Sequence, residues 1–142
     1  MPEDSQSISS FPLYDLHSHT TASDGLLTPT ALVSRAVDMR VSVLAITDHD
    51  TTIGLDEAQQ AIAQQGLPLR LIPGVEISTL WENHEIHIVG LGMDITHPAL
   101  TGLLQQQAAC RQNRAEQIAA RLEKNRIPDA LPNCAVATPF QS

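Results

Sequence analysis

The sequence predicts an α/β fold in a single domain, and two observations carry that prediction. Short aliphatic runs of strand length alternate with stretches of helical periodicity along most of the chain. Aromatic residues make up only 3% of the sequence within a hydrophobic content of 42%, so Leu, Ile, Val and Ala must fill the interior. Aliphatic strands of this kind are typical of sheets buried under helices. With 142 residues, the chain is long enough for one domain and too short for two.

Two strand–helix pairs are expected in the first half of the chain. The first strand covers residues 13–17, and Thr28-Pro29 starts a helix that runs to about residue 40, since a capping residue before proline marks a helix start. The second strand covers residues 43–47. The second helix covers residues 54–65, and Gly66 follows it in the position of a C-terminal cap. The first helix turns an apolar face inward, formed by Leu32, Val33, Ala36 and Val37.

The second half predicts two further strands and a long helix. The third strand covers residues 69–77 and is interrupted by Pro73-Gly74, and a polar turn over residues 81–85 leads to a fourth strand over residues 86–91. A long helix, allowing for a bend, then runs from His97-Pro98 to about residue 126. Repeated β-α-β units with short links predict a parallel sheet, either open and doubly wound or part of a barrel.

The two ends of the chain differ from this pattern. Residues 1–10 are polar and acidic, without the basic and apolar regions of a signal peptide, so a flexible leader over residues 1–12 of a cytoplasmic protein is expected. No stretch approaches the roughly 20 apolar residues of a membrane helix. Residues 128–142 contain three prolines and no periodicity, which predicts an irregular tail. Three or four strands are too few to close a barrel, so the chain is expected to be truncated.

The net charge of −8 argues against a nucleic-acid binder that works through a basic surface alone. Basic residues gather late in the sequence, in and just after the predicted long helix. They are expected to form a solvated helix face, with contact to phosphates as the alternative. These residues are Arg111, Arg114, Arg121, Lys124 and Arg126. Cys110 and Cys134 have no disulfide or metal-binding spacing, and Cys110 is expected in the core.

His17 and His19 are the first candidate metal ligands. They lie two residues apart at the end of a predicted strand, so their side chains leave the same face. Two imidazoles placed in this way can share one metal ion. Surface or capping histidines are the alternative interpretation of this pair.

Carboxylates in three later segments favour the metal interpretation. Asp24 follows closely, although a turn aspartate before glycine would explain it as well. Asp48 and Asp50 flank His49 directly after an aliphatic strand, where two buried carboxylates would repel each other without a cation. Glu76 lies in an otherwise apolar strand, so its charge needs a partner. In α/β folds such strand ends are where functional sites occur.

The remaining histidines are less informative. His87 shares a strand face with Glu85 and is a further candidate ligand, with a half-exposed edge strand as the alternative. His84 is expected at the surface, and His97 is expected to act at a helix start without metal. Trp81 is expected to pack against the hairpin rather than to stack on a base. No glycine-rich phosphate loop or nucleophile elbow is present in the sequence.

Four segments in order, DLHSHTTASDG, AITDHDT, PGVEIS and EIHIVGL, closely resemble the motifs of the polymerase and histidinol phosphatase (PHP) domain family. The resemblance covers residues 13–127. Within the family, WENHEIHIVGL is most similar to the bacterial nucleoside 3′,5′-bisphosphate phosphatase and 5′→3′ exoribonuclease AM group. The resemblance to the family implies a distorted seven-stranded β/α barrel, of which this chain would form the N-terminal part with about four strands. It also implies a metal site at the C-terminal ends of the strands.

The resemblance also implies up to three divalent metal ions. Carried over motif by motif, the ligands are His17 and His19 for one ion, Glu76 as a bridge to a second, His87 for that second ion, and Asp24 and His49 for the third. Manganese is the expected metal, and zinc, iron or magnesium are the alternatives. Asp48 and Asp50 would orient the metal ligands through hydrogen bonds without binding the metal themselves, or would position a water molecule.

The implied activity is that of a phosphoesterase, in which a metal-activated water hydrolyses phosphate esters of nucleotides or RNA 5′ ends. The alternatives are an inactive or partner-dependent metal-binding remnant and a histidinol phosphatase. Neither a membrane nor a stable protein partner is implied. The family's later histidine in an Ala-His-Pro context and its closing Asp-x-His motif do not occur here. A truncated or frame-shifted product of a longer gene is therefore expected.

Overall fold

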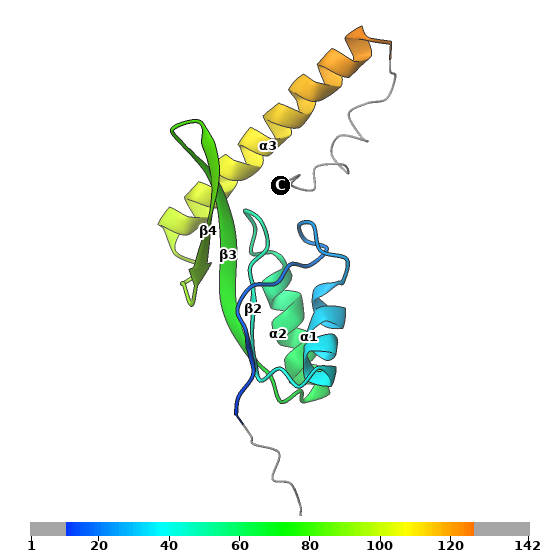
Figure 1. Cartoon of the computed structure of the whole chain (residues 1–142), viewed down its shortest axis with the longest axis vertical. Helices are drawn as coiled ribbons and strands as arrows, with labels where there is room; N and C mark the ends of the chain where they lie inside the picture. The colour runs from blue at the N-terminus through cyan, green and yellow to red at the C-terminus, as the bar shows by residue number, and fades with distance from the viewer. Residues whose placement is uncertain (1–10, 127–142) are drawn as a thin grey trace, which may run out of the picture.

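The four strands lie in one sheet in the order in which they occur along the chain. They are β1 (Tyr14–Asp15), β2 (Val43–Ile46), β3 (Arg70–Trp81) and β4 (His84–Leu91), and the helices are α1 (Pro29–Asp38), α2 (Gly54–Gln65) and α3 (Pro98–Lys124). In this computed structural model, α1 and α2 cover one side of the sheet, whereas α3 crosses behind the β3–β4 hairpin and projects away from them (Figure 1). The structure describes residues 11–126, so the leader and tail predicted at the chain ends lie almost wholly outside the described residues.

Both early helices begin and end where the sequence predicts. The Thr28 hydroxyl accepts a hydrogen bond of 3.1 Å from the amide of Ala31, and Pro29 occupies the first turn of α1. Helix α2 ends at Gly66, whose φ of +59° lies in the left-handed region that a side chain would disfavour.

The main hydrophobic core lies between these two helices and the sheet. All four residues of β2 are buried. The predicted inner face of α1 is confirmed, because Val33 and Ala36 are buried and their two apolar neighbours pack against the same cluster. The fully buried core members are Val33, Ala36, Leu44, Ile46, Leu55, Ala58, Ala61, Ile62 and Leu69. Each large aliphatic side chain buried there contributes roughly 1.5–3 kcal/mol, so this core holds β2 against the two helices.

The sheet is mixed, so the predicted parallel arrangement is confirmed for three strands and is wrong for the fourth, which forms the expected hairpin. β1, β2 and β3 run parallel, but β4 is antiparallel to β3 because the turn between them contains only Glu82 and Asn83, too short for a parallel crossover. The predicted break at Pro73-Gly74 is also absent. Pairing with β4 begins at Gly74, so the missing amide hydrogen of Pro73 removes no hydrogen bond from that ladder.

Helix α3 follows its prediction closely at the start. The Nδ1 atom of His97 accepts a hydrogen bond of 3.1 Å from the amide of Ala99, which confirms a capping role without metal. The expectation that Cys110 is a core residue is wrong, since its side chain is exposed. Gln107 and Arg111 of helix α3 form hydrogen bonds with Asp50, and Gln107 also donates to the carbonyl of Ser78 in β3. Among residues 11–126, no helix combines the length and apolar character needed to cross a membrane.

Candidate metal centre

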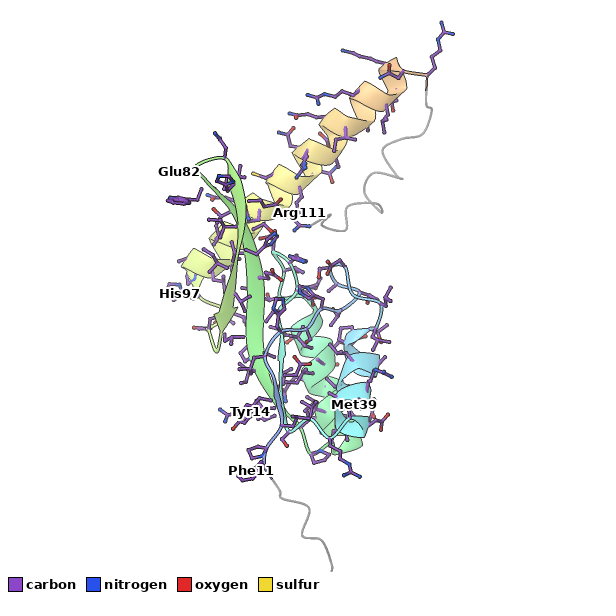
Figure 2. The ribbon with its side chains drawn as sticks, in the orientation of Figure 1. Phe11, Tyr14, Met39, Glu82, His97 and Arg111 are labelled. Atoms are coloured by element: carbon purple, nitrogen blue, oxygen red, sulfur yellow. The ribbon has the colours of Figure 1, made fainter. Side chains whose placement is uncertain are left out.

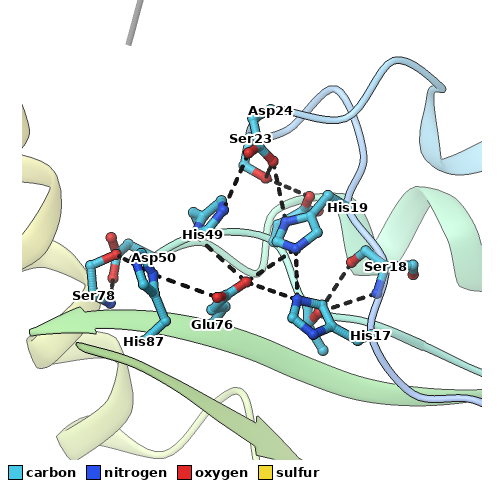
Figure 3. A network of polar contacts seen from close by, with 12 residues as sticks. His17, Ser18, His19, Ser23, Asp24, His49, Asp50, Glu76, Ser78 and His87 are labelled. Carbon is cyan, nitrogen blue, oxygen red and sulfur yellow. Dashed lines mark hydrogen bonds and ion pairs between the residues drawn. The ribbon is translucent and has the colours of Figure 1, made fainter. Parts of the chain in front are cut away.

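All six predicted ligands meet at one end of the sheet. His17 and His19 follow β1, His49 follows β2, and Glu76 and His87 face one another from β3 and β4, while Asp24 reaches in from the loop after His19 (Figure 3). The parallel strands direct their C-terminal ends to the same edge, which is where open α/β sheets place their sites. His49 also forms an isolated parallel bridge with Glu76, so the backbone itself fixes their separation.

The first group consists of His17, His19 and Glu76. The Nε2 atoms of the two histidines are 2.9 Å apart, and each lies 3.0 Å from Oε2 of Glu76. Two ligand atoms about 2.1 Å from the same ion and at right angles to each other are about 3.0 Å apart. The spacing of these three donor atoms therefore fits coordination of one divalent ion.

Two more groups share ligands with the first. Nδ1 of His19 lies 3.2 Å from Asp24, and Nε2 of His49 lies 3.3 Å from the other oxygen of the same carboxylate. On the far side, Nδ1 of His87 and Nδ1 of His49 lie 3.5 Å and 3.7 Å from the two oxygens of Glu76. The Asp24 carboxylate thus faces two imidazoles and the Glu76 carboxylate faces four, an arrangement suited to bridging neighbouring cations.

The protonation chemistry of the cluster also fits metal binding. Nδ1 of His19 is buried and makes no well-oriented hydrogen bond, although the Asp24 carboxylate is nearby. Burial lowers the pKa of His49 below its ordinary value, an effect that the carboxylates of Asp24 and Glu76 partly oppose. A neutral imidazole is the form that binds a metal. The mixed nitrogen and oxygen donors suit manganese, iron or zinc, and their chemistry alone does not choose among these ions.

Asp48 holds the loop that carries two of the candidate ligands. Its buried carboxylate accepts hydrogen bonds from the amide and hydroxyl of Thr20, at 2.6 and 2.7 Å, and from the hydroxyl of Ser23 at 2.8 Å. Thr20 and Ser23 lie next to His19 and Asp24 in the sequence. The three donors compensate the negative charge of Asp48, and they fix the loop against β2.

Gly25 allows this loop to close. A Cβ atom at this position would overlap the carbonyl oxygen of His19 and lie 2.7 Å from the amide nitrogen of Thr20. The amide of Gly25 donates to the carbonyl of Thr20 at 2.9 Å. The glycine after Asp24 is therefore required by the close approach of the backbone to itself, and this approach brings the Asp24 carboxylate to His19.

Asp50 points in the opposite direction, toward α3. It accepts hydrogen bonds from the amide of Ser78 at 3.1 Å, from Gln107 at 3.0 Å, and from Nη2 and Nε of Arg111 at 2.7 and 3.2 Å. The cation that compensates this buried carboxylate is a guanidinium. The prediction that the basic residues of α3 form only a solvated face is therefore wrong for Arg111.

Several contributing residues were not predicted. Ser18 and Thr47 join the segment after β1 to β2, through hydrogen bonds of 2.6 Å from the Ser18 hydroxyl to Ala45 and 3.1 Å from the Thr47 hydroxyl to Ser18. Thr20 is fully buried, and a short polar residue beside a histidine pair was a signal that could have been used. Gln107 gave no signal, because it lies in a run of three glutamines.

Two aromatic side chains near the hairpin turn stay outside the site. His84 is exposed, as predicted. Trp81 is 61% exposed, so the expectation that it packs against the hairpin is wrong. Neither residue belongs to the three groups described above.

A mixed α/β sheet with histidines and carboxylates gathered at its strand ends is typical of α/β proteins that bind metal ions there. The chain belongs to the PHP domain family, whose sequence model matches residues 15–127. It is 66% identical over 119 residues to the 5′-3′ exoribonuclease Rnm of Escherichia coli strain K12, covering 84% of this chain and 41% of that protein. It is 48% identical over 109 residues to the 3′,5′-nucleoside bisphosphate phosphatase of Chromobacterium violaceum, covering 77% of this chain and 38% of that protein.

Solved structures show the same fold over the shared part. An amidohydrolase from Chromobacterium violaceum, with bound sulfate and no metal, matches with a TM-score of 0.73 and 44% identity over 84% of this chain and 41% of that one. A protein from Bifidobacterium adolescentis, predicted to be a metal-dependent phosphoesterase, matches with a TM-score of 0.72 and 34% identity over 80% and 39% of the two chains. The chain thus spans about two-fifths of the length of these relatives. The expected α/β architecture, as part of the family's fold, is confirmed.

Proposed function

We propose that the protein is a metal-dependent phosphoesterase that hydrolyses phosphate esters of nucleotides or RNA 5′ ends. The carrying observation is the convergence of four histidines and two carboxylates into three overlapping donor groups; they come from β3, from β4 and from the segments that follow β1 and β2. The substrate class is supported by relatives named as an exoribonuclease and a nucleoside bisphosphate phosphatase. In this proposal residues 13–127 form the family domain, and residues 1–12 and 128–142 lie outside it.

The proposed ligands fall into the three groups already described. They are His17, His19, Asp24, His49, Glu76 and His87. The chemistry that divalent ions supply when bound in such a site is activation of water and neutralisation of charge on a phosphate. Manganese is the proposed ion on the strength of the family resemblance, and the combination of imidazole and carboxylate donors is compatible with it.

The two aspartates that flank His49 in the sequence hold the segments around the proposed site in place. Asp48 fixes the loop that carries His19 and Asp24, and Asp50 fixes α3. These contacts support the predicted orienting role of the two aspartates. Glu76 is only 7% exposed, so its charge is held where water screens it least.

The test is a phosphate-release assay on the 142-residue chain, stripped of metal and then reloaded with Mn²⁺. Adenosine 3′,5′-bisphosphate, a short 5′-phosphorylated RNA and histidinol phosphate are compared as substrates. We expect release from the nucleotide substrates, loss of release in His17→Ala, and no loss in His84→Ala, which changes an exposed histidine outside the cluster.

Three results would count against the proposal. Faster release from histidinol phosphate would favour the histidinol phosphatase alternative. Tight Mn²⁺ binding without release from any substrate would favour the metal-binding remnant. Release that persists unchanged in His17→Ala would show that the activity does not come from this site.

A further inference from the structure

The donor group formed by His49, Glu76 and His87 lies where β2 has ended and β3 continues. The chain stays beside β3 for a few residues after β2. The amide of Glu76 donates to the carbonyl of Asp48 at 3.0 Å, and the amide of Asp50 donates to the carbonyl of Glu76 at 2.9 Å. Within residues 11–126, this backbone pairing ends at Asp50, which has a φ of +51° and leads on to α2.

Ser78 is the next residue of β3 that faces this edge, since the backbone groups of a strand point to alternate sides. Side chains bind both of these backbone groups. The amide of Ser78 donates to Oδ1 of Asp50 at 3.1 Å, and its carbonyl accepts from Nε2 of Gln107 at 2.6 Å. The same Nε2 atom also donates to Oδ1 of Asp50 at 3.0 Å. Asp50 and Gln107 together thus take the place of a neighbouring strand beside Ser78.

Ser78 lies directly opposite His87 in the β3–β4 hairpin. Its hydroxyl is 3.4 Å from Nδ1 of His87, and Figure 3 shows both residues beside Asp50 at one end of the cluster. Nδ1 of His87 in turn lies 3.5 Å from Oε1 of Glu76, which is two residues before Ser78 on the same strand. A shift of Ser78 would therefore move the imidazole and the carboxylate of this donor group relative to His49.

Two side chains of α3 bind Asp50 at different oxygens. Arg111, labelled in Figure 2, lies one helical turn after Gln107 and places Nη2 2.7 Å from Oδ2, where it compensates the charge of the carboxylate. Gln107 binds Oδ1 and also reaches the carbonyl of Ser78. Gln107 thus connects the helix to the strand that carries Glu76, which the contacts of Arg111 with Asp50 do not.

We propose that Gln107 is a positioning residue for the metal centre, and that it holds His87 and Glu76 in place through the carbonyl of Ser78. Its amide suits this role, because one nitrogen supplies two protons in a fixed plane and carries no charge. An aliphatic side chain there would leave this carbonyl and the buried Asp50 each without one donor. The inference rests on the proposed function, since it assumes that the donor group with His87 binds a divalent ion.

The measurement is a titration of the metal-free 142-residue chain with Co²⁺, followed by calorimetry and by visible absorption, which reports the ligand geometry around the ions. We expect Q107A to weaken one class of sites about 10–100-fold and to leave the remaining ions bound as in the parent chain. Q106A is the matched control, because Gln106 is an exposed glutamine next to Gln107 on the same helix. It should bind Co²⁺ as the parent does.

A double-mutant cycle assigns the effect to His87. H87A should weaken the same class of sites, and the double variant Q107A/H87A should lose no more than H87A alone, because both changes act on one ion.

Q107E gives an independent check. Glutamate fills nearly the same volume as glutamine, but its carboxylate would face the carbonyl of Ser78 and the carboxylate of Asp50. Q107E should therefore weaken binding more than Q107A does. If Gln107 only filled space, the order of the two variants would be reversed.

The parent chain supplies a test that does not depend on the folding of any variant. The side-chain amide protons of Gln107 should exchange with solvent at least about tenfold more slowly than those of Gln106, as followed by NMR. Equal exchange in the two glutamines would overturn the inference. So would binding by Q107A equal to that of the parent, equal weakening of all bound ions, or additive losses in the cycle.

The outcomes separate this inference from the proposed function. Selective loss of one class of sites in Q107A, without phosphate release by the parent from any substrate, would support the positioning role and count against the phosphoesterase function. Phosphate release by the parent together with unchanged Co²⁺ binding in Q107A would overturn the positioning role while the phosphoesterase function stands.

Discussion

Nη2 of Arg111 lies 2.7 Å from Oδ2 of Asp50, and this ion pair joins the segment after β2 to α3 across 61 positions of sequence. The Asp50 side chain is 3% exposed and that of Arg111 is 34% exposed. Asp50 also has a φ of +51°, a left-handed conformation that aspartate tolerates better than most residues. One buried carboxylate thus contributes two of the contacts that hold α3 beside the candidate metal centre, through Gln107 and Arg111.

Removal of the guanidinium should loosen α3. R111A leaves the buried Asp50 with fewer donors, and we expect a loss of about 1–3 kcal/mol in the free energy of unfolding, below the range for fully buried pairs because Arg111 is partly exposed. Urea denaturation checks the value. R121A is the control and should change stability by less than about 0.5 kcal/mol. Equal stability of R111A and the parent chain would show that the ion pair does not hold the helix.

Removal of the Asp48 charge should weaken metal binding without removing a ligand. D48N replaces one of the two acceptor oxygens by an NH2 group and removes the negative charge, so the three hydrogen bonds from Thr20 and Ser23 are reduced in number and weakened. His19 and Asp24 are then held less firmly. Residues that orient metal ligands typically change affinity about 10–100-fold, and we expect a change in that range. Calorimetric titration with Mn²⁺ measures it, with D38N in α1 as the control. An unchanged affinity in D48N would remove the orienting role.

Two glycine-to-alanine changes should have opposite effects. G25A places a methyl group against the backbone of His19, so we expect lower stability and weaker Mn²⁺ binding. At Gly102 in α3 an added Cβ meets nothing within 4 Å, and G102A should raise stability by about 0.5–1 kcal/mol because alanine favours a helix. Thermal unfolding compares the two variants. A G25A chain as stable as the parent would contradict the close-approach requirement.

The stability of the metal-free chain should fall as the pH decreases below about 6.5. Burial lowers the folded-state pKa of His49 from its ordinary value of 6.5, so the unfolded chain takes up this proton first. The loss in the free energy of unfolding is absent above the unfolded-state pKa. It grows as the pH falls through that pKa, and it becomes constant below the folded-state pKa. Urea denaturation from pH 8 to pH 5 in the presence of a chelator measures it. H49Q should flatten the profile, whereas H84Q should not.

The cluster could be predicted from sequence because its parts are local. His17 and His19 are spaced for one strand face, and Glu76 stands out as a charge in an apolar strand. Parallel strand ends then bring such residues together whatever the details of packing. The helix boundaries were accessible for the same reason, since Thr28-Pro29 and Gly66 act on their own neighbours.

The errors concern contacts that no local pattern encodes. The hairpin turn was predicted too wide because Glu82 and Asn83 both adopt positive φ without a glycine to mark it. Cys110 and Arg111 were misplaced because the exposed face of α3 is decided by its polar attachment to Asp50, 61 positions away. The exposure of such side chains depends on how the helix packs against the sheet, and the periodicity of the helix sequence does not determine it.

Glu76 faces histidines in two of the three donor groups, so its substitution offers the sharpest test of the metal centre. The measurement is a calorimetric titration of the metal-free chain with Mn²⁺, for the parent, E76Q and H84Q. We predict saturable binding of more than one ion by the parent and by H84Q, and a loss of affinity of at least about tenfold in E76Q. No saturable binding by the parent chain, or binding by E76Q equal to that of the parent, would contradict a metal centre built on these six residues.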